Sequence, residues 1–167
     1  MSARTLLLMR HAKSDYPPGV IDRERPLAPR GIREAGLAGE WLRSSVPPID
    51  AVLCSTATRT RETLTRTGLL DVPVTFDERL YDAVPGTVVD VINGVDDRVA
   101  TLLVIGHEPA LSNVAVGLAG APGSSQAAAE RISTKFPTSA IAVLRADAPW
   151  RDLTMGAAVL VTFHVAR

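Results

Sequence analysis

The stretch Thr5-Leu6-Leu7-Leu8-Met9-Arg10-His11 decides the fold, because an apolar run ends abruptly in two residues that can carry chemistry. An apolar run without polar alternation is typical of a strand covered on both faces, as in α/β sheets. Such sheets bind ligands at the carboxyl ends of their strands. Arg10 suits a phosphate or a carboxylate, and His11 can be a nucleophile, a base or a metal ligand. The alternative is a structural histidine beside a surface arginine.

Composition indicates an ordinary globular protein. The chain has 167 residues, 46% of them hydrophobic, and we expect one domain over residues 1–167. Lys plus Arg and Asp plus Glu both number 18, which gives no support to a nucleic-acid or membrane partner. The first apolar run is too short for a signal peptide, and no stretch reaches membrane-spanning length, so we expect a cytoplasmic protein. The single Cys54 excludes an intramolecular disulfide and a cysteine zinc site.

Strand and helix patterns alternate along the chain. Strands are expected at 4–9, 51–54, 72–76, 101–105, 139–144 and 159–165, and Pro73 indicates that the third is an edge strand. Helices are expected at 29–44, from the hydroxyl caps Ser55-Thr56 to about 67, at 87–94 and at 109–119. Residues 127–136 are ambiguous, and the role of 120–136 stays open. The alternation predicts a three-layer α/β/α sandwich on a mostly parallel, mixed sheet.

Three of these strands end in polar clusters. Arg10-His11 follows the first, Ser55-Thr56-Ala57-Thr58-Arg59 the second, and Gly106-His107-Glu108-Pro109 the fourth. If the strands are parallel neighbours, two arginines and two histidines converge beside helix N-termini, which favour anions. This is chemistry for a dianionic tetrahedral group such as phosphate. The alternatives are an exposed Arg59 paired with Glu62, and a loop histidine at 107 that only fixes the turn.

Other chemistry has weaker support. Cysteine phosphatases need an arginine six positions after the cysteine, but Thr60 occupies that position after Cys54, and the glycines of their phosphate loop are absent. We expect Cys54 to be a small core residue and His164 to be structural. A metal site built on His11 and His107 would have arginines beside it that repel a cation, and no third ligand is evident.

The stretches LLLMRHAKS (6–14), STATRTRET (55–63) and VIGHEP (104–109) together resemble the histidine phosphatase superfamily. The chain looks most like its small phosphohistidine phosphatase branch, the SixA type, to which FPTSAIA (136–142) and the segment from Asp22 to Leu27 are also similar. The resemblance extends from the first strand to about Leu144 and implies a phosphoglycerate mutase-like fold. Ala12 replaces the glycine that usually follows Arg-His in the superfamily, as is common in this branch.

The resemblance also implies roles for individual residues. His11 is expected to be the nucleophile that becomes phosphorylated, Arg10 and Arg59 to bind phosphate, and His107 to be a further phosphate ligand. Ser14 is expected to contact the substrate, and no cofactor or metal is implied. For the general acid, Asp22 is the better candidate in this branch, although it could simply pair with Arg25. Glu78 and Asp82 lie in the segment from which larger members take their acid.

We expect two successive displacements at phosphorus, with a phosphohistidine intermediate on His11. The positive charges should lower the pKa of His11, its second ring nitrogen should donate to a backbone carbonyl, and His107 should be protonated. Phosphohistidine in a protein is the favoured substrate, because imidazole leaves without an acid and the short chain leaves the pocket open. The alternatives are an aryl or sugar phosphatase, a mutase, or a non-catalytic phosphate-binding or phosphoprotein-binding module. The oligomeric state stays open.

Overall fold

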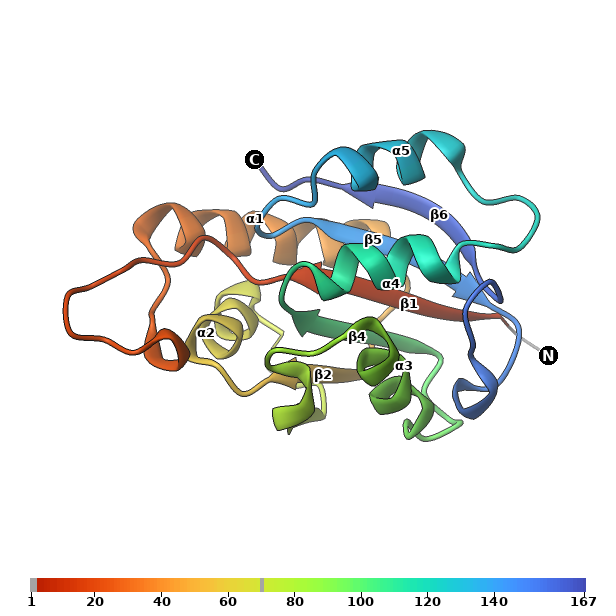
Figure 1. Cartoon of the computed structure of the whole chain (residues 1–167), viewed down its shortest axis with the longest axis horizontal. Coiled ribbons are helices and arrows are strands. Elements are labelled where there is room, and N and C mark those ends of the chain that lie inside the picture. Colours follow the sequence, from red (N-terminus) through yellow and green to blue (C-terminus); the bar gives the residue numbers. More distant parts are fainter. Residues whose placement is uncertain (1–2, 70) are drawn as a thin grey trace.

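The computed structural model describes residues 3–69 and 71–167, and this part of the chain forms a six-stranded sheet between two layers of helices (Figure 1). The strands are β1 (Arg4–Arg10), β2 (Ala51–Ser55), β3 (Val74–Asp77), β4 (Thr101–Gly106), β5 (Ile141–Ala146) and β6 (Val159–His164). The helices are α1 (Pro29–Ser45), α2 (Thr58–Thr67), α3 (Pro85–Asn93), α4 (Ala110–Leu118) and α5 (Gln126–Thr134). The predicted α/β/α sandwich is therefore confirmed.

The strand order is β3-β2-β4-β1-β5-β6. The first four of these strands are parallel, while β5 is antiparallel to both of its neighbours, so the sheet is mixed as expected. The third strand lies at an edge, as Pro73 predicted. The sheet therefore places the ends of β1, β4 and β2 next to one another.

The apolar run of β1 has no polar alternation because both of its faces are buried. Leu6 and Leu8 pack with α3, α4 and α5 in one core cluster, whereas Leu7 and Met9 pack with α1 and α2 in the other. All four side chains are at most 1% exposed. Burial of this kind stabilises the fold by about 1.5–3 kcal/mol per large apolar side chain.

Strand register decides which residues meet at the carboxyl edge. Arg10 pairs with Gly106 between β1 and β4, and Cys54 of β2 pairs with Ile105 of β4. The amide of His11 continues this pattern by donating to the Gly106 carbonyl at 3.0 Å. The three polar clusters consequently open on one edge of the sheet, as the sequence predicted.

Some expected boundaries are wrong. The Ser55 and Thr56 hydroxyls do not cap α2, whose N-cap is Ala57 without a side-chain hydrogen bond. The ambiguous segment is the helix α5, where the Ser125 side chain accepts from the Ala128 amide. Strand β5 begins at Ile141 rather than at 139, because Ser139 has a φ of 64°, which no extended strand adopts. Helix α3 begins at Pro85, two residues before the expected start.

Within residues 3–69 and 71–167, no helix combines the length and the apolar character that crossing a membrane requires. The same residues contain no group of three or more His, Cys, Asp or Glu side chains arranged to hold a metal ion.

Candidate active site

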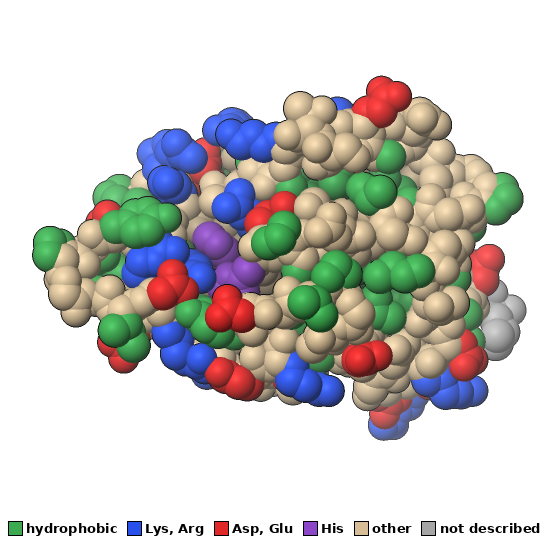
Figure 2. Space-filling view, in the orientation of Figure 1, with side chains coloured by type: hydrophobic (Ala, Val, Ile, Leu, Met, Phe, Trp, Pro, Cys, Tyr) green, Lys and Arg blue, Asp and Glu red, His purple; other side chains and the backbone are tan. Residues whose placement is uncertain are grey.

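The two histidines predicted to share a site lie side by side at the carboxyl edge of the sheet. His11 follows β1 and His107 follows β4, and their ring centroids are 5.3 Å apart. Figure 2 shows histidine side chains in a hollow of the surface, with Lys and Arg side chains close to them. Segments almost a hundred residues apart in the chain therefore form one cationic pocket.

The His11 ring is oriented by its own backbone. Its Nδ1 lies 2.7 Å from the Ala12 carbonyl oxygen, so Nδ1 donates to that carbonyl and Nε2 keeps its lone pair, as expected. Burial is the largest of the causes that lower the pKa of His11 to about 3, and the charges of the nearby His107, Arg59 and Arg10 add to it. Removal from water, rather than the arginines, is therefore the main reason that His11 is neutral.

His107 is held by a serine at the end of β2. The Ser55 hydroxyl lies 2.7 Å from Nε2 of His107, while Nδ1 is buried and has no hydrogen-bond partner among the described residues. Burial, followed by the charge of Arg59, lowers the pKa of His107 to about 4. The expectation of a protonated His107 is therefore wrong for this arrangement, because a ring with that pKa is neutral near pH 7. A neutral ring still donates one hydrogen bond, through Nδ1 when Ser55 donates to Nε2.

Arg10 is anchored by the segment that precedes β5. Its Nη1 donates to the Phe136 carbonyl at 3.0 Å, and its Nε is buried without a partner in the described part of the chain. Burial lowers the pKa of Arg10. The residues after α5, whose role the sequence left open, thus orient the arginine beside the nucleophile candidate.

Arg59 extends from α2 into the pocket and is 7% exposed. Its Nη1 donates to the Asp22 carbonyl at 2.8 Å and its Nη2 to the Asp22 carboxylate at 3.1 Å. Its Nε is another buried nitrogen without a partner in the described residues. The alternative of an exposed pair with Glu62 is wrong, since Glu62 accepts from the Leu27 amide instead.

Asp22 lies at the rim of this pocket as an ionised group. Its carboxylate accepts hydrogen bonds from the Tyr81 hydroxyl, Arg25 and Arg59. The Tyr81 hydroxyl is the largest of the causes that lower the pKa of Asp22 to about 2, and the two arginines add to it. In this arrangement Asp22 therefore carries no proton to donate at neutral pH, and it also makes the expected pair with Arg25.

The remaining candidates make no hydrogen bond to either histidine ring within the described part of the chain. Glu78 is paired with Arg23 and accepts from Thr56, contacts that lower its pKa to about 2. Asp82 is exposed, with a φ of 55°. The Ser14 hydroxyl is buried and accepts from Arg25 at 2.8 Å, so it supports the loop that carries Asp22.

Sequence reasoning missed two side chains that shape the site. The sequence predicts a helix cap at Ser55, although its position directly after a buried strand is a signal for the site. Nothing in the sequence pointed to Tyr81, whose ring meets the His107 ring edge-on at 5.5 Å and lies within 5.9 Å of the Arg59 guanidinium. Tyr81 is recognised only from its tertiary contacts.

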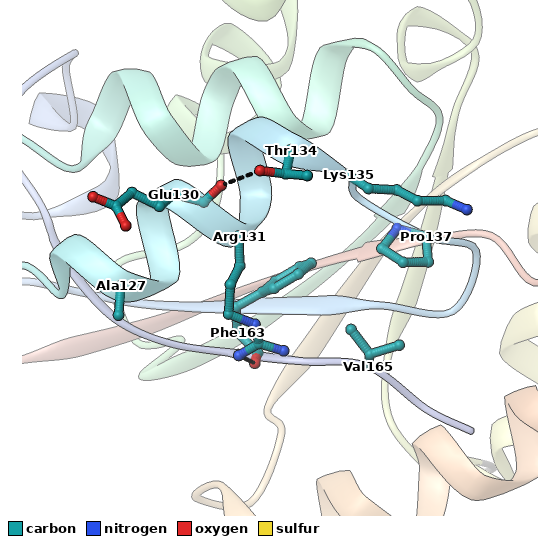
Figure 3. Close-up of a pocket in the computed structure, with 8 residues that line it drawn as sticks. All are labelled: Ala127, Glu130, Arg131, Thr134, Lys135, Pro137, Phe163 and Val165. Carbon is teal, nitrogen blue, oxygen red and sulfur yellow. Dashed lines mark hydrogen bonds between the residues drawn. The ribbon is translucent and has the colours of Figure 1, made fainter.

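A separate hollow of about 460 Å³ lies between α5 and the end of β6 (Figure 3). It is lined by one side of α5 together with Pro137, Phe163 and Val165, and the Arg131 guanidinium crosses it to donate to the Phe163 carbonyl at 2.9 Å. Neither His11 nor His107 lines it, so it is not the pocket described above.

The fold and the histidine-arginine cluster define a class of protein. Residues 6–122 match the family model of the histidine phosphatase superfamily, branch 1, and the chain belongs to this superfamily and to its SixA-type branch. These similarities support phosphatase activity.

The chain is also similar to particular proteins. An uncharacterized protein of Mycobacterium tuberculosis is 62% identical over 159 residues, which cover 95% of this chain and 100% of that protein. A structure from Nakamurella multipartitia, described as a candidate phosphohistidine phosphatase SixA, has a TM-score of 0.91 and 35% identity, covering 99% of this chain and 98% of that one. The protein histidine phosphatase SixA in complex with tungstate has a TM-score of 0.77 and 26% identity over 97% of each chain.

Proposed function

We propose that this protein hydrolyses phosphohistidine in proteins through a phosphorylated intermediate on Nε2 of His11. One observation carries the proposal. Around the His11 ring, Arg10 Nε, Arg59 Nε and His107 Nδ1 are all buried without a hydrogen-bond partner in the described residues. Buried donors of this kind are costly unless a ligand satisfies them. A phosphoryl group, with three equatorial oxygens, offers the acceptors that these nitrogens need.

The reaction follows from the protonation states. Nε2 of His11 attacks phosphorus, the bond from phosphorus to the leaving nitrogen breaks, and the substrate imidazole departs. Water then attacks the phosphohistidine, which releases inorganic phosphate and regenerates the free ring. Because the pKa of His11 is about 3, the nucleophile is available throughout the neutral range. Arg10, Arg59 and His107 stabilise the charge on the equatorial oxygens, the main contribution that a protein makes to phosphoryl transfer.

The leaving group supports phosphohistidine over sugar phosphates. Imidazole leaves readily because its conjugate acid has a pKa of about 6.5, whereas an alkoxide needs a proton donor. Asp22 and Glu78, both with a pKa of about 2, are ionised and supply no such proton. The similarity to a protein histidine phosphatase, SixA, favours the same substrate class.

The test is a brief exposure of the protein to a ³²P-labelled phosphohistidine protein, followed by quenching in alkaline detergent. We expect release of inorganic phosphate and a transient acid-labile label on the enzyme. His11→Asn should abolish the label and lower turnover by at least about 10³-fold. His164→Asn is the matched control, because His164 stacks on Trp41 at 4.2 Å, outside the pocket.

Three outcomes would contradict the proposal. Rapid turnover of sugar phosphates together with resistance of phosphohistidine would assign a different substrate class. Stoichiometric binding without release of phosphate would indicate a binding module. A label that survives in His11→Asn would remove His11 as the nucleophile.

A further inference from the structure

The position of Asp22 at the mouth of the pocket has a consequence for substrate choice. Its side chain is 55% exposed, whereas the Arg59 side chain to which it is bound is 8% exposed. The carboxylate thus lies between the buried Arg59 guanidinium and solvent, on the side that is open to the leaving part of a substrate. A protein side chain or a small organic group attached to the phosphate would pass close to it.

Three separate segments hold this carboxylate in place. Arg25 donates to Oδ1 at 3.1 Å from the same loop, Arg59 donates to Oδ2 at 3.1 Å from α2, and the Tyr81 hydroxyl also donates to Oδ2. The Tyr81 ring is itself fixed against His107, edge-on at 5.5 Å. A carboxylate with two charged donors and one neutral donor is both oriented and ionised.

We propose that Asp22 is a specificity-determining residue that selects substrates whose leaving group carries a protonated nitrogen and disfavours substrates whose leaving group is anionic. This inference rests on the proposed function and deepens it. A phosphoimidazole that is protonated on the nitrogen far from phosphorus presents an N–H that a carboxylate can accept. When the P–N bond breaks, that imidazole departs as a neutral molecule with its proton already in place. The electron pair of the P–N bond stays on the departing nitrogen, and no proton donor is consumed.

The same carboxylate disfavours acidic small molecules. A leaving group that bears its own carboxylate would be repelled by the Asp22 carboxylate, and the repulsion between like charges is stronger in a partly desolvated site than in water. A neutral leaving group avoids this repulsion. The negative charge of Asp22 therefore favours phosphohistidine as a substrate and disfavours phosphorylated organic acids.

The experiment compares the protein with its Asp22→Asn variant in two measurements. The first is kcat/KM for phosphoimidazole. The second is the inhibition constant of 3-phosphoglycerate and that of glycerol 3-phosphate, each measured against phosphoimidazole hydrolysis. Both inhibitors are alkyl phosphates, but only 3-phosphoglycerate carries a carboxylate on its leaving group. We expect kcat/KM for phosphoimidazole to fall at least tenfold. We expect 3-phosphoglycerate to gain at least fivefold in affinity relative to glycerol 3-phosphate.

Asp15→Asn is the matched control, because it changes the net charge equally in the same loop while its carboxylate accepts from the Tyr16 amide. Asp15→Asn should leave both measurements within twofold of the unsubstituted protein. Tyr81→Phe keeps the Asp22 charge but removes one of its donors, so it should lower kcat/KM for phosphoimidazole while leaving the ratio of the two inhibition constants within twofold.

The inference is overturned if either measurement is unchanged in Asp22→Asn, or if kcat/KM and both inhibition constants worsen by one common factor, as a merely structural role would produce. If the unsubstituted protein does not release phosphate from a phosphohistidine protein through His11, the proposed function itself fails. If it does and Asp22→Asn behaves identically, the proposed function stands and only the role of Asp22 is lost.

Discussion

At the scale of single residues, the Ser55 hydroxyl is the hydrogen-bond partner of the second histidine. It lies 2.7 Å from Nε2 of His107 and also 3.4 Å from the Ala57 amide, which can donate to it. With the serine accepting from the backbone and donating to the ring, Nδ1 of His107 carries the proton, and this buried nitrogen has no hydrogen-bond partner in the described residues. Partners that fix a histidine tautomer in this way orient the ring as well as its proton.

Ser55→Ala should therefore lower kcat by about tenfold or more, because His107 loses the contact that fixes its tautomer. The measurement is kcat on phosphoimidazole, together with thermal unfolding to confirm that the fold is intact. Thr56→Ala is the matched control, since the neighbouring hydroxyl contacts Arg23 and Glu78 rather than a histidine. A Ser55→Ala protein with unchanged kcat would show that the tautomer of His107 has no part in the reaction.

At the scale of elements, the position of Arg59 depends on how closely α2 packs on α1. A Cβ atom added at Gly39 of α1 would lie 2.1 Å from the Thr67 carbonyl oxygen of α2, so only glycine permits this approach. At Gly36, one turn earlier in the same helix, the nearest atom to an added Cβ is 3.9 Å away. The close backbone contact between α1 and α2 is thus confined to the side of α1 that carries Gly39.

Gly39→Ala should destabilise the protein by about 1–3 kcal/mol, because the backbones of α1 and α2 must separate to admit the methyl group. Gly36→Ala should be neutral or should stabilise by up to about 1 kcal/mol, since alanine is the better helix former. Urea unfolding of both variants measures the two free energies. Equal stability of the two variants would contradict the tight packing between the helices.

At the scale of the whole molecule, folding moves two histidines out of water and keeps them neutral. The pKa of His11 falls from 6.5 to about 3 and that of His107 from 6.5 to about 4. Below pH 6.5 the unfolded chain therefore binds more protons than the folded protein. The free energy of unfolding must then decrease as the pH falls, down to the pKa values of the folded state.

We expect the free energy of unfolding to drop by about 2–4 kcal/mol between pH 7 and pH 5. Asp22 does not contribute in this window, because the stability that follows from its pKa of about 2 is lost only below its ordinary value of 3.8. Urea unfolding at pH 7, 6 and 5 measures the dependence, and the double variant His11→Asn/His107→Asn should flatten it. Stability that stays constant from pH 7 to pH 5 would mean that the histidines are not neutral in the fold.

Much of the fold and the centre of the site could be predicted from the sequence alone. The unbroken apolar run of β1, the polar clusters after three strands and the alternation of elements are local patterns, and they predicted the sandwich and the meeting of His11 with His107. The superfamily followed from the same stretches. These features could be predicted because a strand that is buried on both faces requires an unbroken apolar run. The alternation of strands and helices along the chain likewise follows directly from the α/β architecture.

Only the tertiary structure decided the partners and protonation states within the site. It paired Arg59 with Asp22 rather than Glu62, brought Tyr81 and Ser55 against His107, and assigned the Phe136 carbonyl to Arg10. It also made His107 neutral where the sequence suggested a cation. Such outcomes depend on which distant segments touch and on how much water is excluded between them, and neither quantity is encoded in the spacing of residues along the chain.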